Sequence, residues 1–311
     1  MINSRFSKSR KAINRSEKIF LASVWTVPII LFLILYVYIN FNSILLAFKH
    51  ITSDDLVEFE WTLDYNFKLF FNTVFKDPQL KYAVWNSVAV YLFNIVVNTP
   101  LQIFLAFLIY KKVHGYNFLK VVFFLPQIIA SIAWVSMFRY FDEFALSTIA
   151  SRIFNQTRFL DKYSVFGFWT LVVFSGWLSL GGSMVLYVGT FSRIPDSVIE
   201  AGKLDGLNIM QEFIYVAVPL VFSLISVSLV TSVHTIFTNQ LCIYAFWGAD
   251  AGPQLYTLGY FLFVSVMSSG NIQGQGLTMT AAGGLVITAI VAPLTLGMRA
   301  LVEKIDPGVS Y

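Results

Sequence analysis

The stretch from residue 194 to residue 213 gathers charged and turn-forming side chains in a chain that is otherwise mostly apolar. Pro195 suits the first position of a helix, where its missing N–H is not needed, and Asp205-Gly206 is a strong turn signal. Glu200 and Lys203 fall between them. The pattern predicts a short, protruding surface helix that ends at the turn and exposes its charged side chains.

A second short helix is predicted after this turn. Asn208 can cap its start, with Gln211 three residues later as the reciprocal partner of a capping box. In the first helix, apolar residues at i, i+3 and i+6 form one narrow stripe: Val198, Ala201 and Leu204. Two short helices with a corner between them form a surface feature rather than a membrane span.

Neutral polar and aromatic side chains recur inside the long apolar runs of the chain. The candidates for solute contact are Gln127, Ser131, Ser175, Ser179, Phe237, Asn239 and Gln240. Amides and hydroxyls can hydrogen-bond a sugar and aromatic rings can stack on it, so this set suits a sugar better than an ion. The alternative is hydrogen bonding between helices, which is common for Ser, Asn and Gln in membranes.

Several other chemistries are excluded by the residues present. Cys242 is the only cysteine, which rules out an internal disulfide and a cysteine-based metal cluster. There is no glycine-rich phosphate loop ending in Gly-Lys-Ser/Thr, no Gly-x-Ser-x-Gly nucleophile elbow and no basic–aromatic patch for nucleic acid. We therefore expect no enzymatic activity, no metal site, no nucleic-acid partner and no cofactor held by this chain.

The composition places these residues in a membrane. Hydrophobic residues make up 57% of the 311 residues, and charged residues only 12%. Soluble domains carry roughly 25% charged residues, and they need polar surface to cover their cores. The excess apolar surface must therefore face lipid or other protein.

Uncharged windows locate the membrane spans, because a helix needs about 20 apolar residues to cross a bilayer. The windows are residues 19–48, 82–110, 121–138, 163–192, 213–249 and 251–298. The last window is too long for one helix and is broken at Ser268-Ser269-Gly270-Asn271. Residues 255–267 are therefore expected to form a re-entrant or surface helix, and residues 277–301 the final span.

The predicted fold class is an all-α polytopic membrane protein with six transmembrane helices. Its expected parts are a basic tail (1–18), a first transmembrane helix (19–48), an external loop (49–81), a five-span domain (82–303) that contains the charged loop at 193–213, and a C-terminal tail (304–311). Asp250, the one charge between the last two windows, is expected in an external loop.

The basic residues predict the orientation, because cytoplasmic loops collect Lys and Arg. Both termini and the loops after spans two and four hold thirteen of them, and the opposite side holds eight. Six of the thirteen lie in the first 18 residues. We therefore expect both termini and the charged loop to be cytoplasmic.

The charged loop resembles the EAA motif of the permeases of type I binding-protein-dependent ABC importers. The family pattern is Ile-Pro, four residues, Glu-Ala-Ala, two residues, Asp-Gly-Ala, and a later Phe and Pro. The matching positions are Ile194, Pro195, Glu200, Ala201, Asp205, Gly206, Phe213 and Pro219. Gly202 and Leu207 stand where the family prefers Ala. The first span and the external loop look most like the carbohydrate branch, the maltose-type permeases.

The resemblance implies a coupling mechanism and a set of partners in the bacterial plasma membrane. Glu200, Ala201, Gly202, Asp205 and Gly206 would dock in a cleft of a cytoplasmic ATPase. A second homologous permease, a dimer of ATP-binding subunits that hold ATP and Mg²⁺, and an extracellular solute-binding protein would complete the importer. In the maltose-type permeases the fourth and fifth spans hold the solute.

Two alternatives remain from the sequence. One is a permease for another solute class, such as glycerol phosphate, phosphate or polyamine, but such solutes would favour charged residues inside the spans. The other is a secondary transporter or channel, which would place ionisable residues within its spans. The identity of the solute, and whether the partner permease is a different chain, are not encoded in these features.

Overall fold

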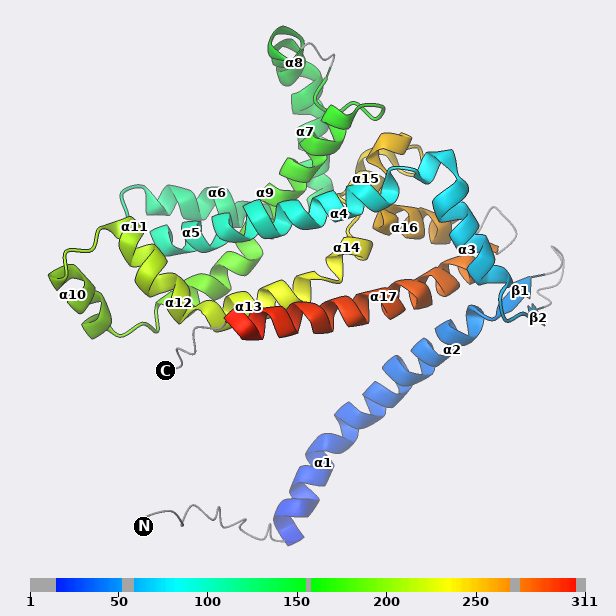
Figure 1. Cartoon of the computed structure of the whole chain (residues 1–311), viewed down its shortest axis with the longest axis horizontal. Helices are drawn as coiled ribbons and strands as arrows, with labels where there is room; N and C mark the ends of the chain where they lie inside the picture. Colours follow the sequence, from blue (N-terminus) through cyan, green and yellow to red (C-terminus); the bar gives the residue numbers. More distant parts are fainter. Residues whose placement is uncertain (1–14, 52–58, 155–157, 269–274, 306–311) are drawn as a thin grey trace.

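The computed structural model describes residues 15–51, 59–154, 158–268 and 275–305, and these residues are mostly helical (Figure 1). Most of the predicted N-terminal tail, residues 269–274 and the end of the chain lie outside these ranges. The α-helices are α1 (Arg15–Leu31), α2 (Ile39–Leu46), α3 (Tyr65–Lys76), α4 (Ala83–Phe93), α5 (Thr99–Tyr110), α6 (Tyr116–Ile128), α7 (Ser131–Phe141), α8 (Ser147–Ile153), α9 (Val165–Phe191), α10 (Asp196–Leu204), α11 (Ile209–Glu212), α12 (Val218–Leu220), α13 (Phe222–Ser232), α14 (Thr235–Thr238), α15 (Ile243–Trp247), α16 (Leu258–Ser268) and α17 (Gln275–Ile305). The π and 3₁₀ segments are η1 (Phe32–Tyr38), η2 (Pro78–Leu80), η3 (Asn94–Asn98), η4 (Asp142–Leu146), η5 (Phe213–Ala217) and η6 (Pro253–Leu255), and the strands are β1 (Lys49–Ile51) and β2 (Phe59–Trp61).

Four continuous helices among the described residues are long and apolar enough to cross a membrane: Ser23–Leu46, Ala83–Tyr110, Val165–Phe191 and Gly276–Ile305. They coincide with the first, second, fourth and last predicted spans. The number rises to six if each of two bent helix pairs counts as one span. A polytopic helical membrane protein is therefore confirmed, and the third and fifth windows take a different form from the straight spans expected.

The third window is not a straight helix. Helix α6 ends at Ile128, and the helical segment that begins with α7 leaves it at an angle of 111°. Ile129 and Ala130 are extended at the corner, with ψ near 137° and 135°. Figure 1 shows α7 standing away from the layer that contains α5 and α6.

The fifth window is bent as well. The helices at Ile209–Leu220 and Phe222–Ser232 meet at 70°, directly after Pro219, which cannot donate its backbone N–H to the helix and so favours a kink. Asn239 and Gln240 were expected in the outer half of a regular span. They instead follow α14 in a non-helical turn, where Leu241 and Cys242 have φ of 50° and 60°.

The end of the chain follows the sequence prediction closely. Helix α16 is short and apolar, as expected for the segment 255–267, and α17 is a single helix that exceeds the predicted final span at both ends. Helix α17 packs against α13, α16 and α3.

The predicted external loop forms a small cap at one end of the helical body. Strands β1 and β2 pair antiparallel, and the Asn66 side chain donates hydrogen bonds to the carbonyls of Ala47 and Lys49 at 2.9 and 2.8 Å. These bonds tie α3 to the end of the first span. In Figure 1 the cap lies at the right, and α10 lies at the opposite, left end.

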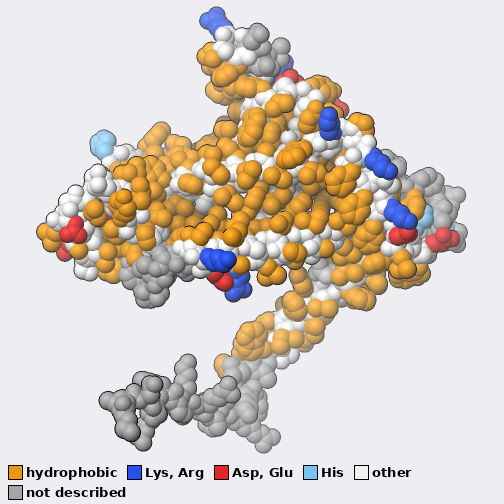
Figure 2. All heavy atoms as spheres, in the orientation of Figure 1, with side chains coloured by type: hydrophobic (Ala, Val, Ile, Leu, Met, Phe, Trp, Pro, Cys, Tyr) orange, Lys and Arg blue, Asp and Glu red, His pale blue; other side chains and the backbone are white. Residues whose placement is uncertain are grey.

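The surface is that of a membrane protein. The first span has no buried residue in its most apolar 18-residue window, and it runs apart from the helical body in Figure 1. Hydrophobic side chains cover most of the face seen in Figure 2, whereas Lys, Arg, Asp and Glu gather toward its edges. This distribution matches a bilayer around the middle of the molecule.

Candidate functional site: a coupling loop and an uncharged cavity

The loop at 193–213, hereafter the coupling loop, is closed by its own backbone. Helix α10 ends in a Schellman motif, in which Leu207 N–H donates to Gly202 O at 3.0 Å and Gly206 N–H donates to Lys203 O at 3.1 Å. Gly206 has φ of +78°, the left-handed conformation that favours glycine. The predicted turn is thus present, although the helix begins at Asp196 with Pro195 one position earlier, at its cap.

The second half of the coupling loop begins with the predicted capping box. Asn208 Oδ1 accepts from Gln211 N–H, and Gln211 Oε1 accepts from Asn208 N–H, each at 2.9 Å. Both ends of the corner are therefore fixed by local hydrogen bonds.

The two departures from the family pattern compensate each other. A Cβ at position 202 would lie 3.2 Å from Leu207 Cδ1, which is closer than an ordinary van der Waals contact. The Leu207 side chain thus fills the space that the methyl group of an alanine at position 202 would need. The small residue at 202 and the large residue at 207 keep the corner packed.

Helix α10 turns one face to the body and another to its surroundings. Ile199 and Gly202 are buried, whereas Glu200 and Ala201 are exposed, and Leu204 is 90% exposed. Of the predicted apolar stripe, Val198 is half-buried and the other two residues face outward. An exposed carboxylate beside exposed apolar side chains is suited to docking another protein.

A cavity of about 1060 Å³ lies between the membrane spans. Six of the seven residues predicted to contact a solute line it: Gln127, Ser131, Ser175, Ser179, Asn239 and Gln240. Phe237 does not line it and packs instead against the hydrophobic clusters around Phe261 and Ile236. The corner at Ile129 and Ala130 is part of the wall, so the bend in the third window helps to form the cavity.

Some of these side chains are already engaged within the protein. Asn239 Oδ1 accepts from Leu241 N–H at 2.8 Å and so supports the left-handed turn. Ser179 Oγ donates to Gly176 O and accepts from Asn98 Nδ2, at 2.8 and 2.9 Å. Gln127 Nε2 donates to Leu178 O at 2.6 Å, which links α6 to α9.

The second span contributes amides that the sequence-based selection missed. Asn94, Asn98 and Gln102 all line the cavity, and Asn98 Nδ2 also donates to Asn94 Oδ1 at 3.1 Å. Their spacing of i, i+4 and i+8 places them on one helix face, and this was the signal that could have found them. The π segment η3 ends at Asn98.

The cavity is uncharged. Its lining contains no Asp, Glu, Lys, Arg or His among the described residues, and its aromatic members are Tyr244 and Phe263, which form an edge-to-face pair at 4.9 Å. No group of three or more His, Cys, Asp or Glu residues in the described ranges could hold a metal ion. The arrangement can hydrogen-bond a neutral polar molecule and stack against it, but it offers no charge to an ion.

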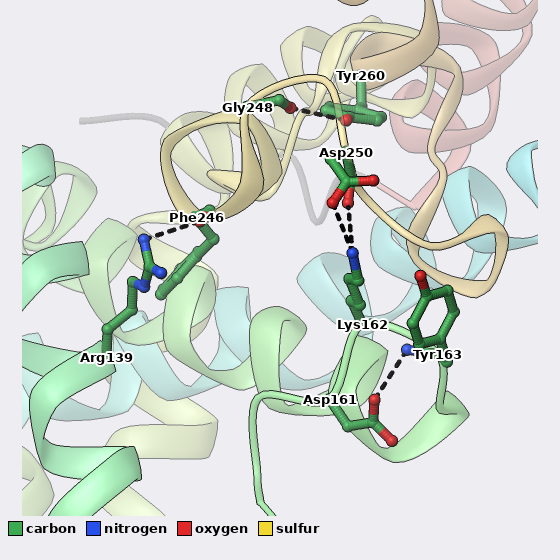
Figure 3. A network of polar contacts seen from close by, with 8 residues as sticks. All are labelled: Arg139, Asp161, Lys162, Tyr163, Phe246, Gly248, Asp250 and Tyr260. Carbon is green, nitrogen blue, oxygen red and sulfur yellow. Dashed lines mark hydrogen bonds and ion pairs between the residues drawn. The ribbon is translucent and has the colours of Figure 1, made fainter.

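A polar network near the N-terminal end of α9 supports one wall of the cavity (Figure 3). Lys162 Nζ lies 2.6 Å from Asp250 Oδ2, and this hydrogen bond raises the pKa of Lys162. Arg139 donates to Phe246 O at 3.1 Å, and Tyr260 donates to Gly248 O at 2.8 Å. Asp250 lies on an exposed loop, as expected, and the contacts hold α15 against α7 and α16.

Several sequence relatives are named as permeases of sugar transport systems. The chain is 32% identical over 145 residues to a probable starch degradation products transport system permease of Thermoanaerobacterium thermosulfurigenes, covering 46% of this chain but only 49% of that relative. It is 23% identical over 281 residues to the arabinooligosaccharides transport system permease of Bacillus subtilis, covering 88% of this chain and 85% of the relative.

Solved structures share the fold. A chain of a bacterial alginate ABC transporter, solved with an alginate pentasaccharide-bound periplasmic protein, superposes with a TM-score of 0.70 at 17% identity, over 94% of this chain and 96% of that one. The chain therefore has the same fold as this ABC transporter chain over nearly its whole length.

The family model for the binding-protein-dependent transport system inner membrane component matches residues 84–311. This match takes in every cavity-lining helix and the whole coupling loop. Since it spans well over half of the sequence, the chain belongs to the family of binding-protein-dependent transport system inner membrane components.

Proposed function

We propose that this inner-membrane chain is one permease subunit of an importer for neutral oligosaccharides, with six spans and both termini in the cytoplasm. The observation that carries the proposal is the uncharged cavity lined by amides and hydroxyls. Its volume of about 1060 Å³ lies slightly above the range of roughly 300–1,000 Å³ for small-molecule sites, so it has room for more than one sugar ring. The names of the relatives point to the same solute class.

The free hydrogen-bonding atoms of the lining favour a solute rich in donors. The amide nitrogens of Asn98, Gln102 and Gln127 donate within the protein. Their side-chain oxygens accept no hydrogen bond from another residue in the part of the chain that the structure describes. Sugar hydroxyls can donate to these oxygens, whereas the ionised oxygens of a phosphate or carboxylate group only accept hydrogen bonds.

Energy for import would come from partner proteins. The exposed face of α10, with Glu200 and Ala201 followed by Asp205 and Gly206, would dock on an ATPase subunit that binds ATP and Mg²⁺. A second permease would supply the other docking loop for the second ATPase subunit. A solute-binding protein would deliver the sugar from outside. This chain then needs no catalytic residue and no cofactor of its own.

A solute panel tests the proposed function. The complex that copurifies with this chain is reconstituted in vesicles, and ATP-dependent uptake is measured for maltotriose, arabinotriose and lactose, and for glycerol 3-phosphate and spermidine. Uptake of a neutral oligosaccharide alone supports the proposal. Uptake of the phosphate ester or the polyamine would contradict it, and uptake without ATP would indicate a secondary transporter.

Asn98→Leu is expected to reduce oligosaccharide uptake about tenfold. The change removes one cavity acceptor and leaves Ser179 and Asn94 without their amide donor, and an unpaired buried polar group costs about 1–3 kcal/mol, where 1.4 kcal/mol is tenfold. Uptake at a solute concentration below half-saturation measures the effect. Asn117→Leu, at an exposed amide before the third window, is the control, and equal uptake by the two variants would exclude Asn98 from the site.

A further inference from the structure

Both ends of the coupling loop rest on the same short stretch of α5. Phe191 ends α9 directly before the loop, and its ring meets Phe107 edge-on with 5.7 Å between centroids. Phe213 ends the loop, and its ring lies 5.2 Å from Phe107. Phe107 is fully buried between them, so the loop is held at both ends by one side chain of the second span.

An ion pair adds a charged contact at the same place. Lys111 Nζ, one residue beyond α5, lies 2.6 Å from Glu212 Oε1, and the two side chains are only 17% and 6% exposed. In each of the other four ion pairs among the described residues, at least one side chain is more than half exposed. Glu212 Oε1 accepts no hydrogen bond of ordinary geometry, so Lys111 is its compensating charge.

The position of this pair matters because α5 continues into the cavity wall. Gln102 lies nine residues before Lys111, about 14 Å along the helix at 1.5 Å per residue, and Asn98 lies one turn further. A displacement of the end of α5 therefore moves cavity amides. Apolar side chains can slide past one another at little cost. Separating a buried ion pair leaves an uncompensated charge, so the Lys111–Glu212 pair holds the loop and the helix in one register.

We infer that the end of α5, from Phe107 to Lys111, is the anchor of the coupling loop, and that the Lys111–Glu212 pair is the positioning contact that passes movement of α10 into the second span. The inference rests on the proposed ATP-driven import. In this view the second span links α10, the helix that docks on the ATPase, to the cavity amides of Asn98 and Gln102.

Cys242 provides a readout that does not depend on the solute, because it is the sole cysteine of the chain and lines the cavity. In the copurified complex, the rate at which N-ethylmaleimide labels Cys242 is measured with and without ATP plus vanadate, and mass analysis assigns the label to this chain. Cys242→Ser gives the background. We expect a several-fold change in rate on trapping the wild-type complex.

Lys111→Met and Glu212→Gln are each expected to abolish this nucleotide-dependent change while the ATPase still copurifies. The exchange variant, Lys111→Glu with Glu212→Lys, is expected to restore at least half of it. Glu303→Gln, which breaks the exposed pair with Arg299, is the matched control and should respond as wild type does. Copurification of the ATPase with each single variant separates this role from mere stabilisation of the fold, because a misfolded loop would not hold the ATPase.

Three results would overturn the inference. An unchanged nucleotide response in both single variants would show that the pair transmits nothing. A failure of the exchange variant to respond, although its ATPase copurifies, would show that the charges are not paired functionally. If wild-type labelling itself ignores ATP and vanadate, the proposed ATP coupling fails together with the inference, whereas the first two results leave the proposed function standing.

Discussion

Glu200→Arg is expected to reduce ATP-dependent uptake by roughly a hundredfold or more and to release the ATPase from the purified complex. Glu200 is exposed on α10, whose C-terminal end is closed by the Schellman motif. Reversing its charge therefore changes the docking surface and leaves the fold of the loop intact. A lost interfacial charge pair costs about 2–5 kcal/mol, and each 1.4 kcal/mol is tenfold.

The measurement is a pull-down of the chain from its native membrane in mild detergent, with the partners identified by mass, followed by uptake in vesicles. Glu303→Arg makes the same charge change at an exposed position near the end of α17 and should keep both the ATPase and the uptake. If Glu200→Arg retains the ATPase and transports normally, α10 is not the docking element.

The coupling loop was largely predictable because its structure is local. The turn at Asp205-Gly206 and the box formed by Asn208 and Gln211 depend on side chains within four residues of each other. What the motif could not reveal is why Gly202 and Leu207 differ from the family pattern. That explanation needs the contact between the two residues, which forms only once the corner has folded.

The straight spans were predictable and the bent ones were not, for one physical reason. An uncharged window reports that a segment can lie in lipid, but it does not report where its helix breaks. Pro219 was a visible signal for the bend in the fifth window. In the third window, Pro126 lies inside α6, three residues before the corner at Ile129 and Ala130, so the sequence held a weaker signal for that bend. Backbone groups at a break within the membrane are tolerated where they line a cavity, and the tertiary structure forms that cavity.

The cavity was only partly predictable. Six of the seven residues selected for solute contact line the cavity, because polar groups inside an apolar window tend to avoid lipid; their contact with a solute stays a prediction. The amides of the second span were overlooked although their spacing was regular, and Phe237 was selected for its type and lies elsewhere. Which polar atoms remain free depends on partners such as Ser179 and Leu178, and these lie on another helix.

Gly181→Ala is expected to destabilise the assembled permease, although it adds only one methyl group. A Cβ at position 181 in α9 would lie 2.3 Å from the carbonyl oxygen of Phe123 and 2.9 Å from Gln127 Cγ. Helices approach closely at small residues in membranes, and a backbone atom cannot turn aside as a side chain can. Overpacking costs about 1–3 kcal/mol, so the melting temperature of the purified complex should fall by several degrees.

Gly189→Ala is the matched control, because it lies on the same helix and its Cβ would meet nothing within 4 Å. There the helix gains about 0.5–1 kcal/mol from the better propensity of alanine, so the melting temperature should hold or rise. Equal melting temperatures for the two variants would contradict the close approach of α6 and α9.

Gly181→Ala also links packing to transport. A methyl group at position 181 pushes α6 away, which strains the 2.6 Å hydrogen bond from Gln127 to Leu178 and moves Gln127 out of the cavity wall. We therefore expect oligosaccharide uptake by Gly181→Ala to fall even at temperatures where the complex remains folded, and uptake by Gly189→Ala to match the wild type.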